Sequence, residues 1–194
     1  PDFCGLPRPE FGTRTLHNYH DPKLMELPDA DFVRLAWGIL RTAFAEFDDG
    51  VLESHLYDTR NPLQFIVGGD VQLIRERMAI ASFAMPDVQT DESSMAVTSI
   101  TAMLEAKNAK GSGFFAGRTL SELKDGGPRA ARDAVKSAFA TISGERIESG
   151  EFPVIFGPQA VSELANNLIV PGLHASAIYS EDSPFHGKFL QEVA

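Results

Sequence analysis

Histidine is the residue of this chain best suited to metal binding or acid–base chemistry, and two of the five histidines lie close together near the N-terminus. His17 and His20 are three residues apart, and Asp21 follows them directly. Imidazole and carboxylate groups are common zinc ligands. The surrounding segment shows no helical apolar period that would fix their geometry, and no third ligand lies nearby. We therefore interpret these histidines as part of a solvated loop.

A second pair of histidines lies near the C-terminus. His174 and His186 are twelve residues apart, in a segment that also contains Glu181 and Asp182. These four side chains could assemble a metal site for an active hydrolase, although their spacing does not require one. We keep an active hydrolase that uses these side chains to bind a metal as one hypothesis.

Other reactive motifs are absent from the sequence. Cys4 is the only cysteine, which excludes an internal disulfide and a Cys-rich zinc site. It lies in a Pro-rich segment with no helix N-terminus to activate the thiol, so we expect it to be inert. The sequence contains neither a Gly-rich phosphate loop ending in Lys-Ser/Thr nor a Gly-x-Ser-x-Gly motif.

Charge and hydropathy limit the partners of this chain. Its formal net charge is -10, and its Arg and Lys residues are scattered, so a basic surface for DNA or RNA is not predicted. No apolar run reaches the length of a membrane span, and the N-terminal residues lack the apolar core of a signal peptide. We expect a cytoplasmic protein that binds neither nucleic acid nor membranes.

The first half of the chain predicts a helix followed by an antiparallel sheet. Residues 1–30 are expected to form an extended lead-in. Asp29 or Asp31 is the predicted N-cap of a helix that ends at Asp48-Asp49-Gly50. The apolar face of this helix is formed by Phe32, Leu35, Ala36, Ile39, Ala43 and Phe47. Four strands are then predicted, at 51–57, 63–67, 71–84 and 95–107, with a hairpin turn at Gly68-Gly69-Asp70.

The second half predicts two helices around a short strand. Lys110 to Gly113 is expected to be a flexible turn, and Pro128 to open a helix that ends at Gly144. A short strand is predicted at 152–156, and the last helix is expected to run from Gly157-Pro158 to Pro171-Gly172. The predicted fold class is therefore α+β, an antiparallel β-meander with helices packed on it, formed by residues 31–150 and followed by a strand–helix segment at 151–194.

The C-terminal segments carry a resemblance to a known family. Gly150 to Leu164, Ser183 to Lys188 and Glu192 to Ala194 resemble the TldD/PmbA family, long labelled "modulator of DNA gyrase". Members share a Tyr/Phe-Pro-Val-Val/Ile-Phe strand, a helix, and a Ser-x-Phe-x-Gly-Lys-x-Gly-Glu-x-Val stretch. Here Leu190 and Gln191 replace the second Gly and the Glu of that stretch. The order of the upstream elements also resembles the family.

One departure from the family pattern concerns its metal motif. In the TldD-type subunit, the helix after the strand carries His-Glu-x-x-x-His, in which two histidines hold zinc and the glutamate serves as base. Counting along the chain places Asn166, Asn167 and Pro171 at those three positions. The chain therefore resembles the PmbA/TldE type, and the resemblance implies no metal or other cofactor in this chain, with zinc only in a TldD-type partner.

The resemblance implies a function. We expect a non-metal-binding subunit, paired with a TldD-type subunit or with a second copy, of a metallopeptidase complex that degrades or processes unfolded peptides. An antiparallel sheet could hold such a peptide by accepting it as a further strand. Asn166 and Asn167 are candidates to line the peptide channel, or are simply exposed helix residues. The alternative function is a stand-alone regulatory binding protein of gyrase-modulator type without peptidase activity.

A second departure is length. Family members have a strand–helix segment before this region and a large β-rich domain after it, so we expect the sequence to be a piece of a longer protein.

Overall fold

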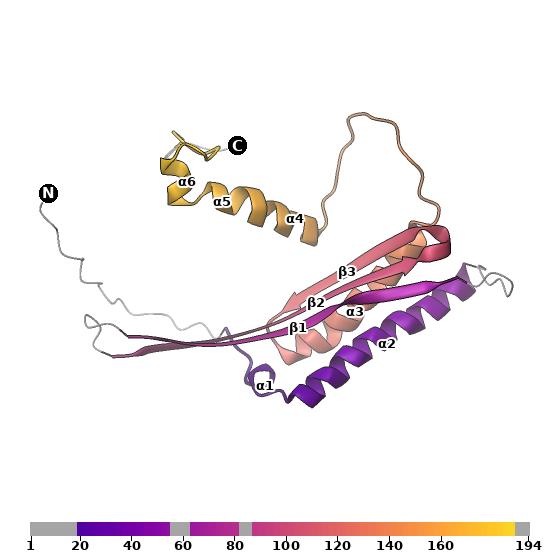
Figure 1. Cartoon of the computed structure of the whole chain (residues 1–194), viewed down its shortest axis with the longest axis horizontal. Helices are drawn as coiled ribbons and strands as arrows, with labels where there is room; N and C mark the ends of the chain where they lie inside the picture. Colours follow the sequence, from indigo (N-terminus) through magenta and orange to yellow (C-terminus); the bar gives the residue numbers. More distant parts are fainter. Residues whose placement is uncertain (1–18, 55–62, 82–86, 189–194) are drawn as a thin grey trace, which may run out of the picture. The chain divides into compact units, whose positions relative to one another are not determined.

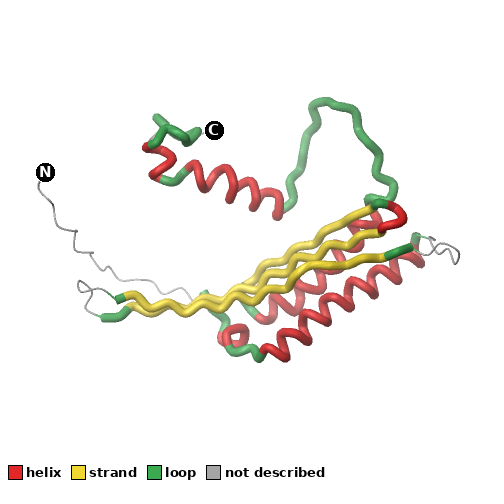
Figure 2. The backbone as a smooth tube through the Cα atoms, in the orientation of Figure 1, coloured by secondary structure: helices red, strands yellow, loops and turns green. Residues whose placement is uncertain are grey.

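The computed structural model describes residues 19–54, 63–81 and 87–188. The chain divides into two units, Pro1–Glu145 and Arg146–Ala194, and each is described by itself. The first unit contains a three-stranded sheet and its covering helices, as Figure 1 and Figure 2 show. The α+β class and the antiparallel meander predicted from the sequence are confirmed.

The sheet consists of β1 (Phe65–Ile80), β2 (Gln89–Leu104) and β3 (Ala109–Gly117), in the order β1-β2-β3 with antiparallel neighbours. A short 3₁₀ turn (η1, Glu105–Lys107) connects β2 to β3. β3 pairs with β2 only as far as Ala96, so β1 and β2 continue beyond it as a two-stranded ribbon.

The predicted hairpin turn at Gly68-Gly69-Asp70 is wrong, because β1 runs straight through these residues. Gly69 pairs with Ile100 and has a φ of +148°, a conformation that residues with a side chain rarely adopt. A Cβ at Gly69 would lie 2.0 Å from the carbonyl oxygen of Ser99. The glycine therefore serves a close approach of two strands rather than a turn.

α2 (Asp29–Glu53) is longer than predicted, because it continues through Gly50. Pro28 is its N-cap, so Asp29 lies in the first helical turn instead of at the predicted cap. A Cβ at Gly50 would lie 2.5 Å from the ring of Phe139, so this glycine admits an aromatic ring against the helix. The first predicted strand is also wrong where the structure describes it, since residues 51–53 belong to α2; its residues 55–57 lie outside the described part.

α3 (Leu120–Ala140) begins well before the predicted start at Pro128, which lies inside it. Thr119 and Glu122 form a capping box, in which each side chain accepts a hydrogen bond from the backbone N–H of the other residue. Hydrogen bonds from the backbone N–H groups of Arg118 and Thr119 hold the pKa of Glu122 below its ordinary value. The capping box stabilises a helix start at Leu120, which explains why α3 begins before Pro128.

α3 packs very closely on β3, and this contact corrects the predicted flexible turn at Lys110 to Gly113. A Cβ at Gly113 would lie 1.8 Å from the carbonyl oxygen of Ala130, and one at Gly111 would lie 2.2 Å from that of Ala134. The glycines remove the side chains that would separate strand and helix. The core formed here and under α2 contains Leu24, Ile39, Ala43, Ala96, Ile100, Ala102, Leu104, Ala109, Phe115, Leu123, Ala130, Ala131, Ala134, Val135 and Ala138.

The segment before α2 is not simply an extended lead-in where the structure describes it. α1 (Pro22–Met25) starts at Asp21, whose side chain accepts hydrogen bonds from Lys23 N and Leu120 N. The Asp21 backbone N–H donates to Ser94 Oγ at 2.8 Å. One aspartate thus joins α1, the start of α3 and β2.

The second unit is helical. α4 (Pro158–Leu164) starts after Gly157 as predicted, and continues through a π-helical segment (η2, Ala165–Ile169) into α5 (Val170–Gly172). Pro171 lacks the N–H that a regular α-helix needs, which accounts for the π-helical segment just before it. α6 (Ala175–Tyr179) follows.

The predicted strand at 152–156 is wrong. These residues have no regular secondary structure, and Ile155 is 99% exposed. A strand needs a neighbouring strand for its backbone hydrogen bonds. Within the second unit, the described residues include no strand that could provide one.

Candidate functional site

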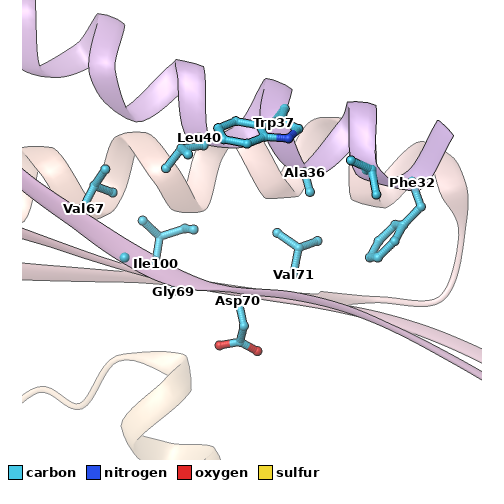
Figure 3. Close-up of a pocket in the computed structure, with 11 residues that line it drawn as sticks. Phe32, Ala36, Trp37, Leu40, Val67, Gly69, Asp70, Val71 and Ile100 are labelled. Atoms are coloured by element: carbon cyan, nitrogen blue, oxygen red, sulfur yellow. The ribbon is translucent and has the colours of Figure 1, made fainter. Parts of the chain in front are cut away.

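An apolar groove lies between the N-terminal half of α2 and the middle of β1, and Figure 3 shows its walls. Its volume is about 390 Å³, which is in the range of ligand-binding pockets. The helix side is formed by Phe32, Val33, Ala36, Trp37 and Leu40. The sheet side is formed by Val67, Gly68, Gly69, Asp70, Val71 and Ile100.

The groove exists because small residues face each other across it. Val67, Gly69 and Val71 alternate along the face of β1 that points toward the helices. Gly69 has no side chain, so its neighbour on β2, the buried residue Ile100, forms part of the groove lining. Ala36 contributes only a methyl group from the helix side. Because a Cβ at Gly69 would clash with the carbonyl oxygen of Ser99, no side chain at this position fills the groove.

α2 is attached to β1 at both ends of the groove. At one end, the Arg75 guanidinium donates hydrogen bonds to the carbonyl oxygens of Met25 and Leu27, at 3.2 and 3.1 Å. It also pairs with Asp29, in the first turn of α2, at 3.3 Å. These bonds hold the helix start against the strand, so the separation of α2 and β1 is fixed there.

At the other end, aromatic rings fill the space between α2 and β1. Phe65, the first residue of β1, stacks on Phe47 with ring centroids 4.3 Å apart and planes 7° apart. Phe44 packs edge-on against the same Phe65 ring at 5.6 Å. Such aromatic pairs add stabilisation beyond their buried area. The groove is therefore a preformed opening between two attachments.

β1 is an edge strand along the whole groove. Its inner side pairs with β2, and no described strand pairs with its outer side. Edge strands in monomeric proteins usually carry protective charges or are covered. Residues 65–74 contain one charged side chain, Asp70. An apolar, unpaired edge beside an apolar groove is a surface suited to an added strand.

The groove is suited to binding rather than to acid–base catalysis. Among the described residues of its lining, Asp70 is the only titratable one. Its carboxylate points away from the groove, toward the face of the sheet opposite the helices, and accepts a hydrogen bond from Gln72 Nε2. Trp37 is 56% exposed at the groove wall, so a large aromatic surface is available to a ligand.

Asn166 and Asn167, the candidate channel residues, lie in the π-helical segment of the second unit and are both exposed. Asn167 Nδ2 donates to the carbonyl oxygen of Glu163 at 2.8 Å, and Asn166 Nδ2 approaches Ser162 Oγ at 3.4 Å. Their role in a channel stays a prediction.

Ser183 is the first residue of the Ser-x-Phe-x-Gly-Lys stretch that resembles the family. It is buried, and it forms a hydrogen bond with the C-terminal end of α5. Its hydroxyl donates to the carbonyl oxygen of Gly172 and accepts from the backbone N–H of Phe185. A Cβ at Gly172 would lie 3.1 Å from the ring of Phe185, so the ring packs closely against this glycine. These contacts give the motif a structural role.

The histidines do not gather into a metal site within the described residues. His186 Nδ1 lies 2.9 Å from the carbonyl oxygen of Ile178, and its Nε2 lies 3.9 Å from Glu181. His174 is the N-cap of α6. His20 Nε2 lies 3.6 Å from Glu92. His17 and Cys4 lie outside the described residues.

Sequence reasoning missed the groove, and it did so at Gly68-Gly69, which were interpreted as a turn. Two glycines inside an otherwise unbroken strand pattern were the available signal, since an interior glycine often marks a close approach of another chain or a ligand.

Among the described helices, none is long and apolar enough to cross a membrane. Comparison with protein-family models, curated proteins and solved structures finds no match to this chain.

Proposed function

We propose that this chain binds unfolded polypeptide in an extended conformation, as the non-metal-binding subunit of a cytoplasmic peptidase of the TldD/PmbA type. The observation that carries the binding part is the apolar groove beside the unpaired edge of β1. An added strand gains backbone hydrogen bonds from the edge and buries side chains in the groove. Neither source of affinity depends on one particular peptide sequence, which suits a protein that handles many unfolded chains.

The subunit assignment is supported by the resemblance of the C-terminal segments. Asn166, Asn167 and Pro171 stand where the TldD-type subunit carries His-Glu-x-x-x-His, and none of them supplies a zinc-bound water with a base. Zinc and catalysis would belong to a TldD-type partner, and the present chain would present the peptide. The partner is a TldD-type subunit or, in a homodimer, a second copy.

Trp37 gives a direct test of peptide binding, because it is the only tryptophan of the chain and lies in the groove wall. An unfolded, tryptophan-free polypeptide should shift its fluorescence to shorter wavelength as the ring leaves water. The same polypeptide in its folded form is the control, because its backbone is already paired. An unchanged spectrum with both forms would count against the binding function.

The subunit assignment needs a separate test. The natural protein, purified from its own host, should co-purify with a subunit that carries His-Glu-x-x-x-His. The mixture should hydrolyse the unfolded polypeptide, and the chain alone should not. Hydrolysis by the chain alone, with a metal lost on substitution of His174, would instead support the alternative hydrolase.

A further inference from the structure

We propose that the groove selects extended segments in which apolar residues alternate with basic ones, with one large apolar side chain inserted over Gly69. This inference rests on the proposed peptide-binding function and specifies the peptide. It follows from three features of the first unit: the period of β1, the missing side chain at Gly69, and the position of Asp70.

The period of a strand fixes which side chains of an added peptide meet which surface. Successive residues of a strand point to opposite faces of a sheet, and residues opposite each other on neighbouring strands share a face. One set of peptide side chains would therefore lie beside Val67, Gly69 and Val71, facing α2. The other set would lie beside Gly68, Asp70 and Gln72, on the face without helices.

The helix-facing set must be apolar. Its surroundings are the groove walls, whose helix side contains no charged residue. Gly69 lies between Val67 and Val71 and has no side chain, so a peptide side chain beside Gly69 has more room than one beside either valine. A polar side chain there would lose water without gaining a partner. A large aliphatic or aromatic side chain fills the space and buries the exposed face of Trp37.

The other set lies beside a negative charge. Asp70 is the only charged residue between 65 and 74, and the whole chain carries a formal net charge of -10. The nearest cationic residue along β1 is Arg75, whose guanidinium already donates hydrogen bonds to the carbonyl oxygens of Met25 and Leu27 and pairs with Asp29. A lysine or arginine beside Asp70 is therefore attracted and an acidic residue is repelled.

The experiment uses three capped ten-residue peptides and the fluorescence of Trp37. The first alternates Val and Lys, the second contains the same residues with the valines and lysines in two blocks, and the third alternates Val and Glu. We expect the first to bind about tenfold more tightly than either of the others, since an anchor side chain commonly contributes that much. The advantage over the Glu peptide should shrink as salt is added.

Substitutions in and near the groove test whether the peptide binds there. Ala36→Leu fills the groove from the helix side and should weaken binding of the alternating Val/Lys peptide about tenfold. Val33→Ser removes apolar wall at a half-exposed position, and should weaken it without any repacking of the core. Gly38→Ala is the matched control, because Gly38 is in α2 but not in the groove lining, and a methyl group there meets no atom within 4 Å. Asp70→Asn should reduce the preference for Lys over Glu about three- to fivefold, as expected for an exposed ion pair.

The outcomes separate this inference from the function on which it rests. Equal binding of the alternating and block peptides, or wild-type binding by both Ala36→Leu and Val33→Ser, would overturn the proposed selectivity while peptide binding stands. Failure of all three peptides and of the unfolded polypeptide would overturn peptide binding itself.

Discussion

Thr98 provides a test of the packing that supports the groove. It is fully buried in β2, where it pairs with Val71 of the groove on one side and with Phe115 on the other. Its Oγ1 is a buried side-chain oxygen with no hydrogen-bond partner among the residues that the structure describes. A hydroxyl buried in this way costs about 1–3 kcal/mol of folding free energy, because it loses its hydrogen bonds to water and gains none in the folded protein. Thr98→Val removes the hydroxyl and keeps the β-branched shape.

We therefore expect Thr98→Val to raise the free energy of unfolding by about 1–2 kcal/mol, against the usual direction of core substitutions. Urea unfolding followed by far-UV circular dichroism measures this change. With a urea slope near 2 kcal/mol per M, the midpoint should rise by about 0.5–1 M. The slope itself should not change, because the substitution leaves the buried area nearly constant.

Thr98→Ser is the matched control, because it keeps the hydroxyl and removes the methyl group. Its midpoint should fall by the equivalent of about 1 kcal/mol, the usual effect of deleting one buried methyl. The reasoning is refuted if Thr98→Val lowers the midpoint at constant slope. That result would mean that the hydroxyl has a partner, such as a buried water, whose hydrogen bond valine cannot replace.

Four further predictions concern α2, β3 and α3. Gly38→Ala should stabilise the fold by about 0.5–1 kcal/mol, because Gly38 is inside α2 and an added methyl meets no atom within 4 Å; a lower urea midpoint would contradict this. Gly113→Ala should cost about 3 kcal/mol or more, because its methyl would lie 1.8 Å from a backbone carbonyl oxygen of α3, and a variant of normal stability would show that the contact is looser. Thr119→Ala should cost about 1 kcal/mol in the same assay. Because its pKa is lowered in the fold, Glu122 contributes stability at pH values above its ordinary pKa, and this stability is lost as the pH falls through the lowered pKa. Glu122→Gln should therefore reduce the decrease in the free energy of unfolding that occurs below about pH 4.

The parts of the fold predicted correctly are those with a strong local signal. Gly157-Pro158 marks the start of α4, since proline at the first helical position costs no hydrogen bond. The apolar face predicted for α2 includes Ile39 and Ala43, which are buried as expected from their helical spacing. In both cases the residues that determine the structure lie within a few positions of one another.

Three of the wrong predictions share a cause, which is that glycine was taken as a signal for a turn or a helix end. Gly50, Gly69 and Gly113 all lie inside regular elements, each in close contact with a segment distant in the sequence. The contact partner, not the local sequence, explains the glycine in each case. Which glycine makes a turn and which admits a neighbour cannot be decided until the tertiary arrangement is known.

The groove could not be predicted for a related reason. It depends on the distance between α2 and β1, which is set by Arg75 at one end and by the stacked rings of Phe47 and Phe65 at the other. Neither contact has a local sequence signature. The predicted use of the sheet, addition of a peptide strand, requires an unpaired edge, and no described strand pairs with the outer side of β1.

A second copy of the chain could also pair along the edge of β1 that no described strand occupies, and Asp70 bears on that pairing. An antiparallel, two-fold pairing centred on Asp70 would place the Asp70 side chains of both copies opposite each other on the same face. Like charges opposite each other destabilise a strand pair, and the glycines beside Asp70 lower the strand propensity further. The same carboxylate attracts a basic residue of a foreign peptide. Asp70 thus favours a peptide over a second copy at the same edge, and Asp70→Asn should increase self-association as it weakens selection for lysine.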